Sequence, residues 1–592
     1  MKKEDRRLFS HRFQEESVFV HTTDEDINPW DRTRIVAVLV NETGIDYQLA
    51  DRISEEIQSV IFSAGLRVVT SELVRELVNA KLVEHRFEKA RERNRRLGLS
   101  LYDAGNLMRY PTPLRPEQSA TAAGVGSVMA DAIKRQYALS DIYPNHLHRL
   151  HLEGRFHIHG LSAPDRPLMA WIHASDLLEF QYIAGGLIIR KPASPEALVR
   201  NLIRLDSALR GMVHERITWF GLETALASLG VREEDIPGFV IQAVSTRDQL
   251  GMISGLARTA FHLEQRESVD RIVQEQEECP FLAVDILAAG SAWRLSQWVR
   301  LAELPFKQTT YVMEAVTLNL PGLAIRSVIE DTPLDTELRQ LLDKAASILA
   351  RRRVFMEKLA AVRPEGPLDL LGKMGFRPSQ AWGIVGICGL NEMIRVLMDG
   401  DMDDSDDRLK RAEHVVQQLA RQMREVSEER SVYLLLGTVD QMDACYRFAR
   451  LDLKFQPYYA SRILNGDIAE AAVYYSRDGC LPSEKPVSLA RKIQVESRIQ
   501  QVFDLPFPII IKHRDPASLD ARDLTESLRH LLLTADFSLC YNCHTMESGV
   551  YITCPICHDT NVAVYRATTA GYHSVSALPR AVRLAQKRHF FY

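Results

Sequence analysis

Two pairs of cysteines near the end of the chain are the most specific chemical feature of the sequence. Each pair has the spacing Cys-X-X-Cys, and ten residues separate the two pairs, which are Cys540 with Cys543 and Cys554 with Cys557. Each such turn directs two thiolates at one ion, and the hairpin between them folds the second pair onto the first. We predict a tetrahedral zinc site with a structural role, because four thiolates leave no position open for substrate. His544 and His558 are alternative ligands.

Cys388 has a different setting, because it lies in the apolar, glycine-flanked segment GIVGICGLNE (residues 383–392). Such a segment predicts a buried strand or tight loop in which glycine lets the backbone approach a neighbour closely. On these grounds alone Cys388 is a small buried hydrophobic residue. The same reading applies to Cys279, Cys445 and Cys480, which share no spacing. Gly571, which precedes Tyr572, indicates only a turn.

A dense group of histidines is the other cluster of potential ligands. Its members are His146, His148, His151, His157, His159 and His173. On a strand, His157 and His159 would point to the same face. A histidine metal site is possible, but no carboxylate and no spacing rule completes a ligand set. We therefore favour roles in the core or beside a polar substrate.

The elements that must position these residues alternate between strands and helices. From about residue 101 to 537, short apolar runs alternate with long amphipathic patterns. The runs include residues 155–161, 311–320, 382–390 and 432–439, and the helical patterns include residues 338–362 and 408–426. This alternation predicts one large α/β domain with a mostly parallel sheet.

Two amphipathic helices precede that domain. Leu49, Ile53 and Ile57 recur at helical spacing, Gly65 stands where a C-cap is expected, and residues 70–85 repeat the pattern. They predict a small helical domain. The charged residues 1–16 lack periodicity and are expected to form a mobile tail, and the basic run 89–98 is expected to be a solvated linker or helix face.

Composition excludes several classes of protein. Lys and Arg number 73 against 78 Asp and Glu, a net charge of −5, which offers no global positive field for nucleic acid. Eight cysteines are too few for a disulfide scaffold, and the paired ones favour a reducing compartment, so we expect a cytoplasmic protein. We expect neither export nor membrane insertion, because uncharged stretches fall short of the ~18 apolar residues of a membrane span.

Taken in order, these segments resemble the anaerobic (class III) ribonucleoside-triphosphate reductases, a family of glycyl-radical enzymes, over nearly the whole chain. The stretch INPWDRTRIVAVLVNETG, followed by the two helices, resembles the family's ATP-cone, a regulatory domain that binds ATP or dATP. The segments AIKRQYAL, HLEGRFHIHGL, YVMEAVTLNLPGLA, GIVGICGLNE, YRFARLDLK and AEAAVYYS resemble successive parts of its barrel. The cysteine ribbon followed by Gly-Tyr resembles its radical-bearing tail.

The resemblance implies a ten-stranded α/β barrel between an N-terminal ATP-cone and a C-terminal zinc ribbon. The expected divisions are a tail (1–16), an ATP-cone-like domain (17–100), the catalytic barrel (101–537), the zinc ribbon (538–563) and a glycyl-radical tail (564–592). Within the cone, Trp30, Asp31 and Arg32 mark where nucleotide contacts are to be sought.

The resemblance also implies roles for particular residues. Gly571 would store the radical, because a glycine Cα radical can become planar and delocalise into both flanking peptide groups. A separate iron–sulfur activase that uses S-adenosylmethionine would generate that radical, since no cysteine triplet here suits such a cluster. Cys388 would become the thiyl radical at the tip of a loop inside the barrel and take hydrogen from the ribose C3′, so that the 2′-hydroxyl leaves as water. The zinc thiolates would then position the glycine tail.

The implied activity is the anaerobic reduction of ribonucleoside triphosphates to DNA precursors under allosteric control by ATP or dATP. The substrate triphosphate would bind through backbone amides and helix N-termini, since the sequence has no GxxxxGK[ST] loop. A homodimer is typical of the family. Formate or a thiol would serve as reductant, with Cys445 and Cys480 as candidate thiols.

Several departures from the family pattern touch the reductant side and the radical site. Gly160 stands where the family commonly has aspartate, and Met169 stands where it has a cysteine. Residues 438–441, which end at Gln441, depart from a TPAE-like segment, and four residues rather than two separate Arg566 from Gly571.

These departures favour an alternative, a catalytically inactive, nucleotide-sensing regulatory homologue of the reductase. The retained Cys388, Gly571 and four zinc thiols oppose it. A related glycyl-radical reaction on another nucleotide is a further possibility, and a zinc-ribbon DNA-binding protein fits the net charge of −5 poorly.

Overall fold

The computed structural model describes the greater part of the 592-residue chain. The described residues are 18–21, 27–88, 90–91, 122–184, 186–249, 258–263, 285–288, 299–302, 306–362, 366, 368–439, 442–470, 472–512, 528–534, 536–568, 571–575 and 583. The predicted tail 1–16, most of the basic run 89–98, Cys279 and Gln441 lie outside them. The chain divides into two compact units, residues 1–112 with 118–153 and residues 113–117 with 154–592.

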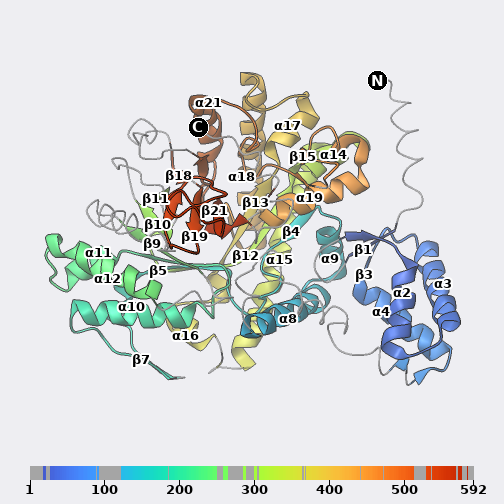
Figure 1. Ribbon diagram of the computed structural model, residues 1–592, viewed down its shortest axis with the longest axis horizontal. Helices are drawn as coiled ribbons and strands as arrows, with labels where there is room; N and C mark the ends of the chain where they lie inside the picture. Colours follow the sequence, from blue (N-terminus) through green and yellow to red (C-terminus); the bar gives the residue numbers. More distant parts are fainter. Residues whose placement is uncertain are drawn as a thin grey trace. The chain divides into compact units, whose positions relative to one another are not determined.

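The first unit combines helices with a small sheet (Figure 1). Its elements are β1 (Phe19–His21), β2 (Ile27–Pro29), α2 (Arg32–Val38), the π-helical turn η1 (Leu39–Thr43), α3 (Tyr47–Ser63), β3 (Val68–Thr70), α4 (Ser71–Glu84), α8 (Ala122–Tyr137), the π-helical turn η2 (Ala138–Ile142) and α9 (Asn145–Leu152). Strand β1 pairs antiparallel with β2 and parallel with β3. The sequence analysis missed this sheet, because strands of three residues are too short to show alternation.

Local sequence explains the two predicted helices, α3 and α4, which the structure confirms. The side chains of Asp46 and Thr70 cap them, each accepting a hydrogen bond of 3.1 Å from the amide three residues on. Their apolar faces meet in one core that contains Ile53 and Ile61, both fully buried. Gly65 adopts φ of 64° just after α3, in the left-handed conformation common at helix ends.

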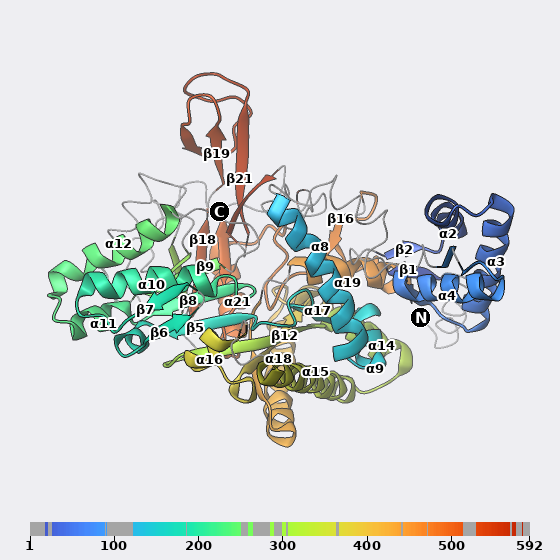
Figure 2. The ribbon, with the colours of Figure 1, turned by 90° about the horizontal axis from the view of Figure 1, so that it is seen from below.

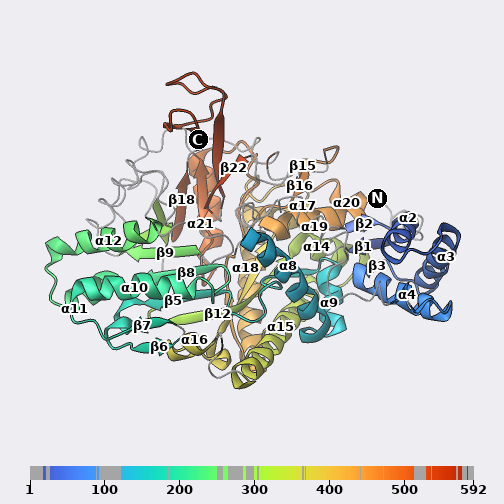
Figure 3. The ribbon, with the colours of Figure 1, turned by 60° about the horizontal axis from the view of Figure 1, so that its bottom comes forward.

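The second unit is built on one large sheet. Its strands are β4 (Phe156–Ile158), β5 (Met169–His173), β8 (Arg216–Phe220), β9 (Arg258–Leu263), β10 (Asp285–Ala288), β11 (Val299–Ala302), β12 (Thr310–Asn319), β13 (Trp382–Cys388), β14 (Tyr433–Leu436), β17 (Ile509–Lys512) and β18 (His530–Thr534). They follow the order β14-β13-β12-β5-β8-β9-β10-β11-β18-β17. Strand β4 lies outside this order and pairs antiparallel with β12. Figure 3 shows β5, β8 and β9 in succession.

Strand direction divides this sheet into two parallel sets. Neighbours along the order are parallel except at β12–β5 and at β11–β18. Every residue of β12 is buried, as expected for a strand covered on both faces. The described strands therefore confirm the predicted α/β domain with a mostly parallel sheet.

A backbone bridge joins the segments beside the two outermost strands of the order. Gly437, which follows β14, pairs in parallel with Leu505, which precedes β17. The amides of Asp504 and Leu505 donate to the Leu436 carbonyl at 2.9 and 3.1 Å. A Cβ at Gly437 would lie 2.9 Å from the Leu505 Cβ, so glycine permits this close approach.

Helices surround the sheet of the second unit. They are η3 (Ala174–Leu178), α10 (Pro195–Leu209), α11 (Leu222–Ser228), η4 (Glu233–Asp235), α12 (Ile236–Gln249), α14 (Leu320–Glu330), α15 (Leu334–Val362), α16 (Asp369–Lys373), η5 (Pro378–Gln380), α17 (Leu390–Met398), α18 (Asp406–Arg430), α19 (Met442–Phe455), α20 (Pro457–Ala460) and α21 (Leu489–Gln500). The long helices α15 and α18, both predicted, lie side by side (Figure 2) and share the ion pair of Arg339 with Glu425 at 2.8 Å. Among the described residues, no helix has the length and apolar character needed to span a membrane.

Three small sheets complete the second unit. They are the hairpin β6 (Tyr182–Ala184) with β7 (Leu187–Ile189), the hairpin β15 (Asn465–Asp467) with β16 (Ala472–Tyr474), and a ribbon in the order β20-β19-β21-β22. The ribbon strands are β19 (Phe537–Cys540), β20 (Met546–Ser548), β21 (Val562–Thr568) and β22 (Gly571–Ser574). A buried ion pair of 3.4 Å links Lys512, at the end of β17, to Asp536, at the start of the ribbon.

Candidate functional site

The ends of strands β12 and β13 form the best-defined polar site within the large sheet. The register of this parallel pair sets Asn319 beside Cys388, and each is the last residue of its strand. A helix begins at once after each strand, with Asn319 as the N-cap of α14 and Gly389 as the N-cap of α17. Ligands in α/β sheets bind at the carboxyl ends of parallel strands, so this edge is where chemistry is expected.

Cys388 is fully buried at this edge. Its Sγ lies 3.3 Å from the Sγ of Cys445 and 3.6 Å from the carbonyl oxygen of Ser476. Burial, together with the Cys445 contact, raises the pKa of the Cys388 thiol well above its ordinary value, so the thiol keeps its proton. The segment is the buried strand that its apolar sequence predicted.

The resemblance implies that Cys388 sits at the tip of a loop, but in the structure it is the last residue of strand β13. Gly389 explains this difference. The residue adopts φ of 77°, which turns the chain directly into α17. A Cβ at Gly389 would lie 2.3 Å from Cγ of Pro321, the second residue of α14. Glycine is therefore required where the two strand-to-helix junctions meet.

Helix α19 crosses both strand ends and supplies a side chain to each. Cys445 and Asp452 are seven residues apart, two turns, and so share one face of the helix. While Cys445 contacts Cys388, the Asp452 carboxylate accepts hydrogen bonds from Asn319 Nδ2 at 2.9 Å and from the Tyr475 hydroxyl at 3.1 Å. One helix thus holds a thiol and a carboxyl group against neighbouring strands.

The Asp452 carboxyl group is fully buried in its surroundings, and its proton affinity follows from that. Burial raises the pKa of Asp452 to about 6, although the hydrogen bond from Asn319 and the charge of Arg326 oppose the rise. Near neutral pH the group therefore exchanges a proton readily.

Glu392 holds the backbone that faces Cys388. It is buried, and its carboxylate accepts hydrogen bonds from the Ser476 hydroxyl at 2.7 Å and from Asn465 Nδ2 at 2.5 Å. Burial raises the pKa of Glu392, and the nearby charge of Arg395 opposes that rise. Through Ser476, whose carbonyl also accepts from the Gly389 amide at 2.7 Å, Glu392 positions the strand end.

The structure places the departures from the family pattern in specific surroundings. Gly160 adopts φ of 62°, and a Cβ there would lie 3.4 Å from Nη1 of Arg352, so a longer acidic side chain would meet that guanidinium. Arg352 instead pairs with Glu314 of β12 at 2.8 Å, both side chains being buried, and donates to the carbonyls of Ala163 and Arg166. The charge of Arg352 is therefore paired within the core by Glu314.

Met169 and Thr438 have structural surroundings. Met169 is the first residue of β5 and packs in an apolar cluster with Trp171 and Phe220. The Thr438 hydroxyl donates to Asp478 at 3.1 Å. Gln441, the last residue of that altered segment, lies outside the described residues.

The histidines are divided between the two units. In the second unit, the rings of His157 and His159 pack edge to face with centroids 4.7 Å apart, and His159 Nε2 lies 2.8 Å from the Thr317 hydroxyl. His173 Nδ1 accepts from the Ser175 amide at 3.1 Å. No group of potential metal ligands in the described part of the chain contains a histidine.

The C-terminal ribbon brings the four predicted metal ligands together. All four Sγ atoms lie within 4.8 Å of one another, with Cys540 and Cys557 3.5 Å apart and Cys543 and Cys554 3.6 Å apart. A tetrahedron with Zn–S distances of about 2.3 Å has S–S edges of about 3.8 Å, so the donor set fits zinc.

The backbone of the ribbon explains how two distant pairs converge. His544 and His558 follow the two Cys-X-X-Cys turns with φ of 59° and 58°, and each amide donates to the carbonyl of the first cysteine of its pair at 3.0 Å. The two turns therefore have the same shape. The metal-ligand group of the structure contains the four cysteines and neither histidine.

Gly571 begins strand β22, which returns antiparallel along β21. The backbone register pairs Thr568 with Gly571 and Arg566 with His573. The longer spacing between Arg566 and Gly571 is thus taken up within a hairpin.

Sequence reasoning singled out Cys388 but not the polar residues around it, which are Asn319, Glu392, Asp452, Tyr475 and Ser476. One local signal was available for Asn319, a polar residue that ends a long apolar run and precedes Leu-Pro, typical of a strand that ends at a helix cap. Nothing local marks Asp452, which reaches the site only because α19 folds across both strands.

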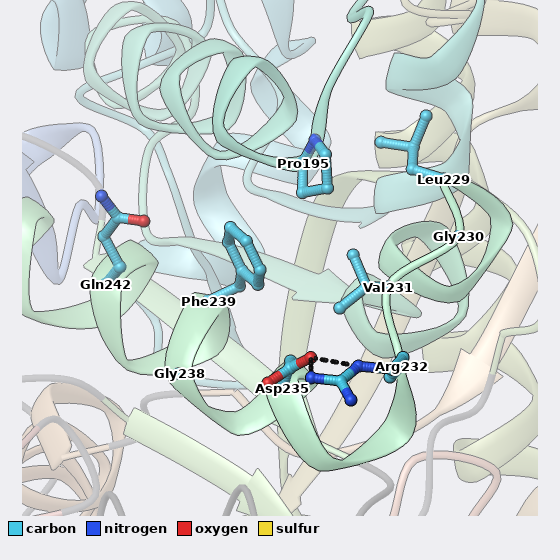
Figure 4. Close-up of a pocket in the computed structure, with 9 residues that line it drawn as sticks. All are labelled: Pro195, Leu229, Gly230, Val231, Arg232, Asp235, Gly238, Phe239 and Gln242. Atoms are coloured by element: carbon cyan, nitrogen blue, oxygen red, sulfur yellow. Dashed lines mark hydrogen bonds and ion pairs between the residues drawn. The ribbon is translucent and has the colours of Figure 1, made fainter.

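A separate surface hollow of about 570 Å³ lies among other elements of the second unit (Figure 4). Leu229, Val231 and Phe239 give it apolar walls, and Arg232 pairs with Asp235 at 2.9 Å at one side. It contains none of the cysteines.

A family model and several solved structures resemble this chain, and both name the anaerobic ribonucleotide reductases. The family model described as anaerobic ribonucleoside-triphosphate reductase matches residues 257–580, more than half of the chain and a span that includes β12, β13 and the ribbon. No curated protein sequence matches.

Solved structures resemble the fold at low sequence identity. A chain described as an anaerobic ribonucleotide reductase superposes with a TM-score of 0.63 and 12% identity, covering 78% of this chain and 89% of that one. The Thermotoga maritima enzyme with dATP bound in the specificity site gives 0.60 and 12%, covering 89% and 98%. The same enzyme in complex with dATP and CTP gives 0.59 and 11%, covering 76% and 90%. With the family match, these results show that the chain belongs to the anaerobic ribonucleoside-triphosphate reductase family, as a divergent member.

Proposed function

We propose that this chain reduces ribonucleoside triphosphates to 2′-deoxyribonucleoside triphosphates in the absence of oxygen, by a glycyl and thiyl radical mechanism. The observation that carries the proposal is the register that sets Asn319 beside Cys388 at the carboxyl ends of two parallel strands. The family match spans both strands.

The environment of Cys388 suits hydrogen-atom chemistry. A thiyl radical forms by loss of a hydrogen atom from an S–H bond, so the thiol must keep its proton until that step. Burial raises the pKa of Cys388 and excludes water, and both effects favour the neutral thiol. In the proposed reaction Gly571 stores the radical, Cys388 loses its hydrogen atom, and the resulting thiyl takes hydrogen from the ribose C3′.

Departure of the 2′-hydroxyl as water requires a proton, and Asp452 is the group proposed to supply it. Its carboxyl group is held by Asn319 and Tyr475, and its pKa of about 6 leaves it partly protonated near neutral pH. Asn319 connects this carboxyl group to the strand end that carries Cys388.

The architecture of the family completes the proposal. The bridge between Gly437 and Leu505 supports closure of the large sheet into a ten-stranded barrel. Residues 17–100, which belong to the first unit, are proposed to form an ATP-cone that responds to ATP or dATP. Two residues of its marked segment already hold the unit together, since Trp30 Nε1 donates to Gln58 at 2.9 Å and Arg32 pairs with Asp51 at 3.0 Å.

Zinc is the metal proposed for the ribbon, held by Cys540, Cys543, Cys554 and Cys557. When bound, it would fix the two turns relative to each other and so hold the hairpin of β21 and β22, in which Gly571 begins the second strand. Further proposed partners are a radical-generating activase that uses S-adenosylmethionine, formate or a thiol as reductant, and a second copy of the chain.

The test is anaerobic turnover with a competent activase, S-adenosylmethionine and either formate or a dithiol, with deoxynucleotides separated by chromatography. We expect Cys388→Ser to lower product formation by on the order of 10³-fold or more. With formate as reductant, which needs no second thiol of the chain, Cys480→Ser is the matched control and should retain activity, because Cys480 is also buried and ends a turn within the same unit. Cys279→Ser is assayed in parallel, since Cys279 also lies within the family match. Loss of activity in Cys279→Ser but not in Cys388→Ser would move the thiyl role to Cys279.

One observation favours the second candidate function, a nucleotide-sensing regulator without catalysis. Met169 occupies the position of an expected cysteine and is packed in an apolar cluster, where it can serve no redox role as a thiol. A wild-type chain that binds nucleotide and carries the radical, yet forms no deoxynucleotide with either reductant, would establish this function in place of the first.

A further inference from the structure

We propose that Cys388 and Cys445 form a redox site, a dithiol that closes to a disulfide on two-electron oxidation. The two Sγ atoms lie 3.3 Å apart, one at the end of strand β13 and the other on helix α19. They are separated by 57 residues in the sequence, so the fold alone brings them together. The inference does not depend on the proposed function.

Only a small movement of the two sulfur atoms is needed to form the disulfide bond. A disulfide has an S–S distance of about 2.05 Å, so the two sulfurs must approach by about 1.3 Å. Side-chain rotation can supply such a shift, because the apolar cluster around the two cysteines contains the small side chains of Ala444 and Ala449 beside the larger Phe448 and Tyr475. No backbone rearrangement of β13 is required to bring the thiols into contact, since they touch already.

Burial makes this pair selective in its chemistry. Cys388 is 0% exposed and Cys445 is 4% exposed. Such small exposed fractions exclude bulky disulfides such as oxidised glutathione, so the oxidant in the proposal is a small hydroperoxide such as H₂O₂. The nearest thiol to an oxidised sulfur is then the other member of the pair, so intramolecular closure competes well with further oxidation.

The reaction balances with one peroxide. The sulfur of one cysteine attacks a peroxide oxygen and the O–O bond breaks, while the thiol proton passes to the leaving hydroxide, which gives a sulfenic acid and one water. The sulfur of the second cysteine then attacks the sulfenic sulfur, the S–O bond breaks, and a second water leaves with the thiol proton. In sum, two thiols and H₂O₂ give one disulfide and two water molecules, with sulfur oxidised and peroxide oxygen reduced.

Closure has a structural consequence. It ties α19, which carries Asp452, covalently to the end of β13, where Cys388 lies beside Asn319 of β12. If the proposed function is correct, the oxidised chain lacks the thiol that it needs, and a dithiol reductant restores it. The pair would then protect Cys388 from irreversible oxidation to a sulfinic acid.

The experiment uses the full chain, reduced and anaerobic, exposed to a few equivalents of H₂O₂ and then denatured in N-ethylmaleimide. Non-reducing tryptic digestion and mass spectrometry should find residues 374–395 linked to residues 431–447, two hydrogens lighter than the sum of the two peptides. Dithiothreitol should return both peptides. Cys480→Ser should give the same link, and Cys445→Ser and Cys445→Ala should abolish it.

Two results would overturn the inference. The first is recovery of both peptides in alkylated form while the cysteines of the ribbon are oxidised, which would reduce the 3.3 Å contact to an S–H···S hydrogen bond. The second is a mixture in which Cys388 links equally to Cys480 or to ribbon cysteines, which would mean that the chain had unfolded before it reacted. The wild-type result decides the matter even if the Cys445 variants fold poorly.

Discussion

The molecule holds cysteine thiols in two contrasting settings, the strand-end site and the C-terminal ribbon. At the strand ends, Cys388 and Cys445 are buried in an apolar cluster, and burial raises the pKa of Cys388. In the ribbon, Cys543 is only half-buried, and a hydrogen bond from Thr545 lowers the pKa of its thiol to about 6. The pKa of the same side chain is thus raised in one place and lowered in the other, as the roles proposed for Cys388 and Cys543 require.

The largest expected difference between the two settings is in thiol reactivity. In the metal-free chain at pH 7, we expect iodoacetamide to modify Cys543 on the order of 10³-fold faster than Cys388, because only the thiolate reacts and only Cys543 is both accessible and partly ionised. Peptide mapping over time measures both rates in one sample. Similar rates in the native chain would contradict the contrast, and the urea-unfolded chain, in which the rates should converge, is the control.

Removal of the metal should affect the ribbon but leave the strand-end site unchanged. We expect Cys543→Ser or a strong chelator to remove bound zinc and to loosen the ribbon, because the metal supplies much of the folding free energy of a small four-thiolate site. Metal analysis should report loss of the bound ion, while exchange of backbone amides in β12 and β13 should stay unchanged. Faster exchange in both regions would mean that the ribbon and the sheet do not fold separately.

Much of the ribbon could be predicted from the sequence because its ligands are local. The Cys-X-X-Cys spacing fixes each turn, and the ten-residue interval fixes the hairpin. The long strands and helices of the second unit were predictable for the same reason, since α15 and α18 each carry a helical period and β12 and β13 are each a continuous apolar run within one segment.

The strand-end site could not be predicted to the same extent, because its members come from distant segments. Cys388 meets Cys445 and Asn319 meets Asp452 only through the packing of α19 across two strands. Periodicity marks α19 as a helix but carries no information on which strand ends it covers. The pairing of Arg352 with Glu314 is hidden in the same way, since the two residues are 38 positions apart in the sequence.

A backbone substitution tests the junction that sets Cys388 at a strand end. We expect Gly389→Ala to destabilise the second unit by about 2–5 kcal/mol, because alanine would be strained at φ of 77° and its Cβ would overlap Pro321. Gly375→Ala is the matched control, because Gly375 has φ of 90° but no atom within 4 Å of a built Cβ, and it should cost only about 1–2 kcal/mol. Thermal unfolding of the three proteins measures the difference, and equal losses would show that Pro321 does not constrain the junction.

The smallest predicted effect concerns the buried carboxyl group of Asp452. Its folded pKa of about 6 lies above the unfolded value of 3.8, so the folded chain binds the extra proton between these values and loses stability as pH rises through that window. We expect Asp452→Asn, which keeps the neutral form, to gain up to about 3 kcal/mol relative to wild type between pH 4 and 7. Thermal unfolding across this range measures the gain, and a pH-independent difference would contradict the raised pKa.

The central claim, that this chain carries radical chemistry, is tested most directly by anaerobic electron paramagnetic resonance. The full chain is incubated with a competent activase, S-adenosylmethionine and a reductant, and wild type is compared with Gly571→Ala. The account predicts a doublet-like glycyl signal in wild type that is absent from the variant. No signal in zinc-loaded wild type, beside a known substrate of the same activase that does acquire one, would contradict the account.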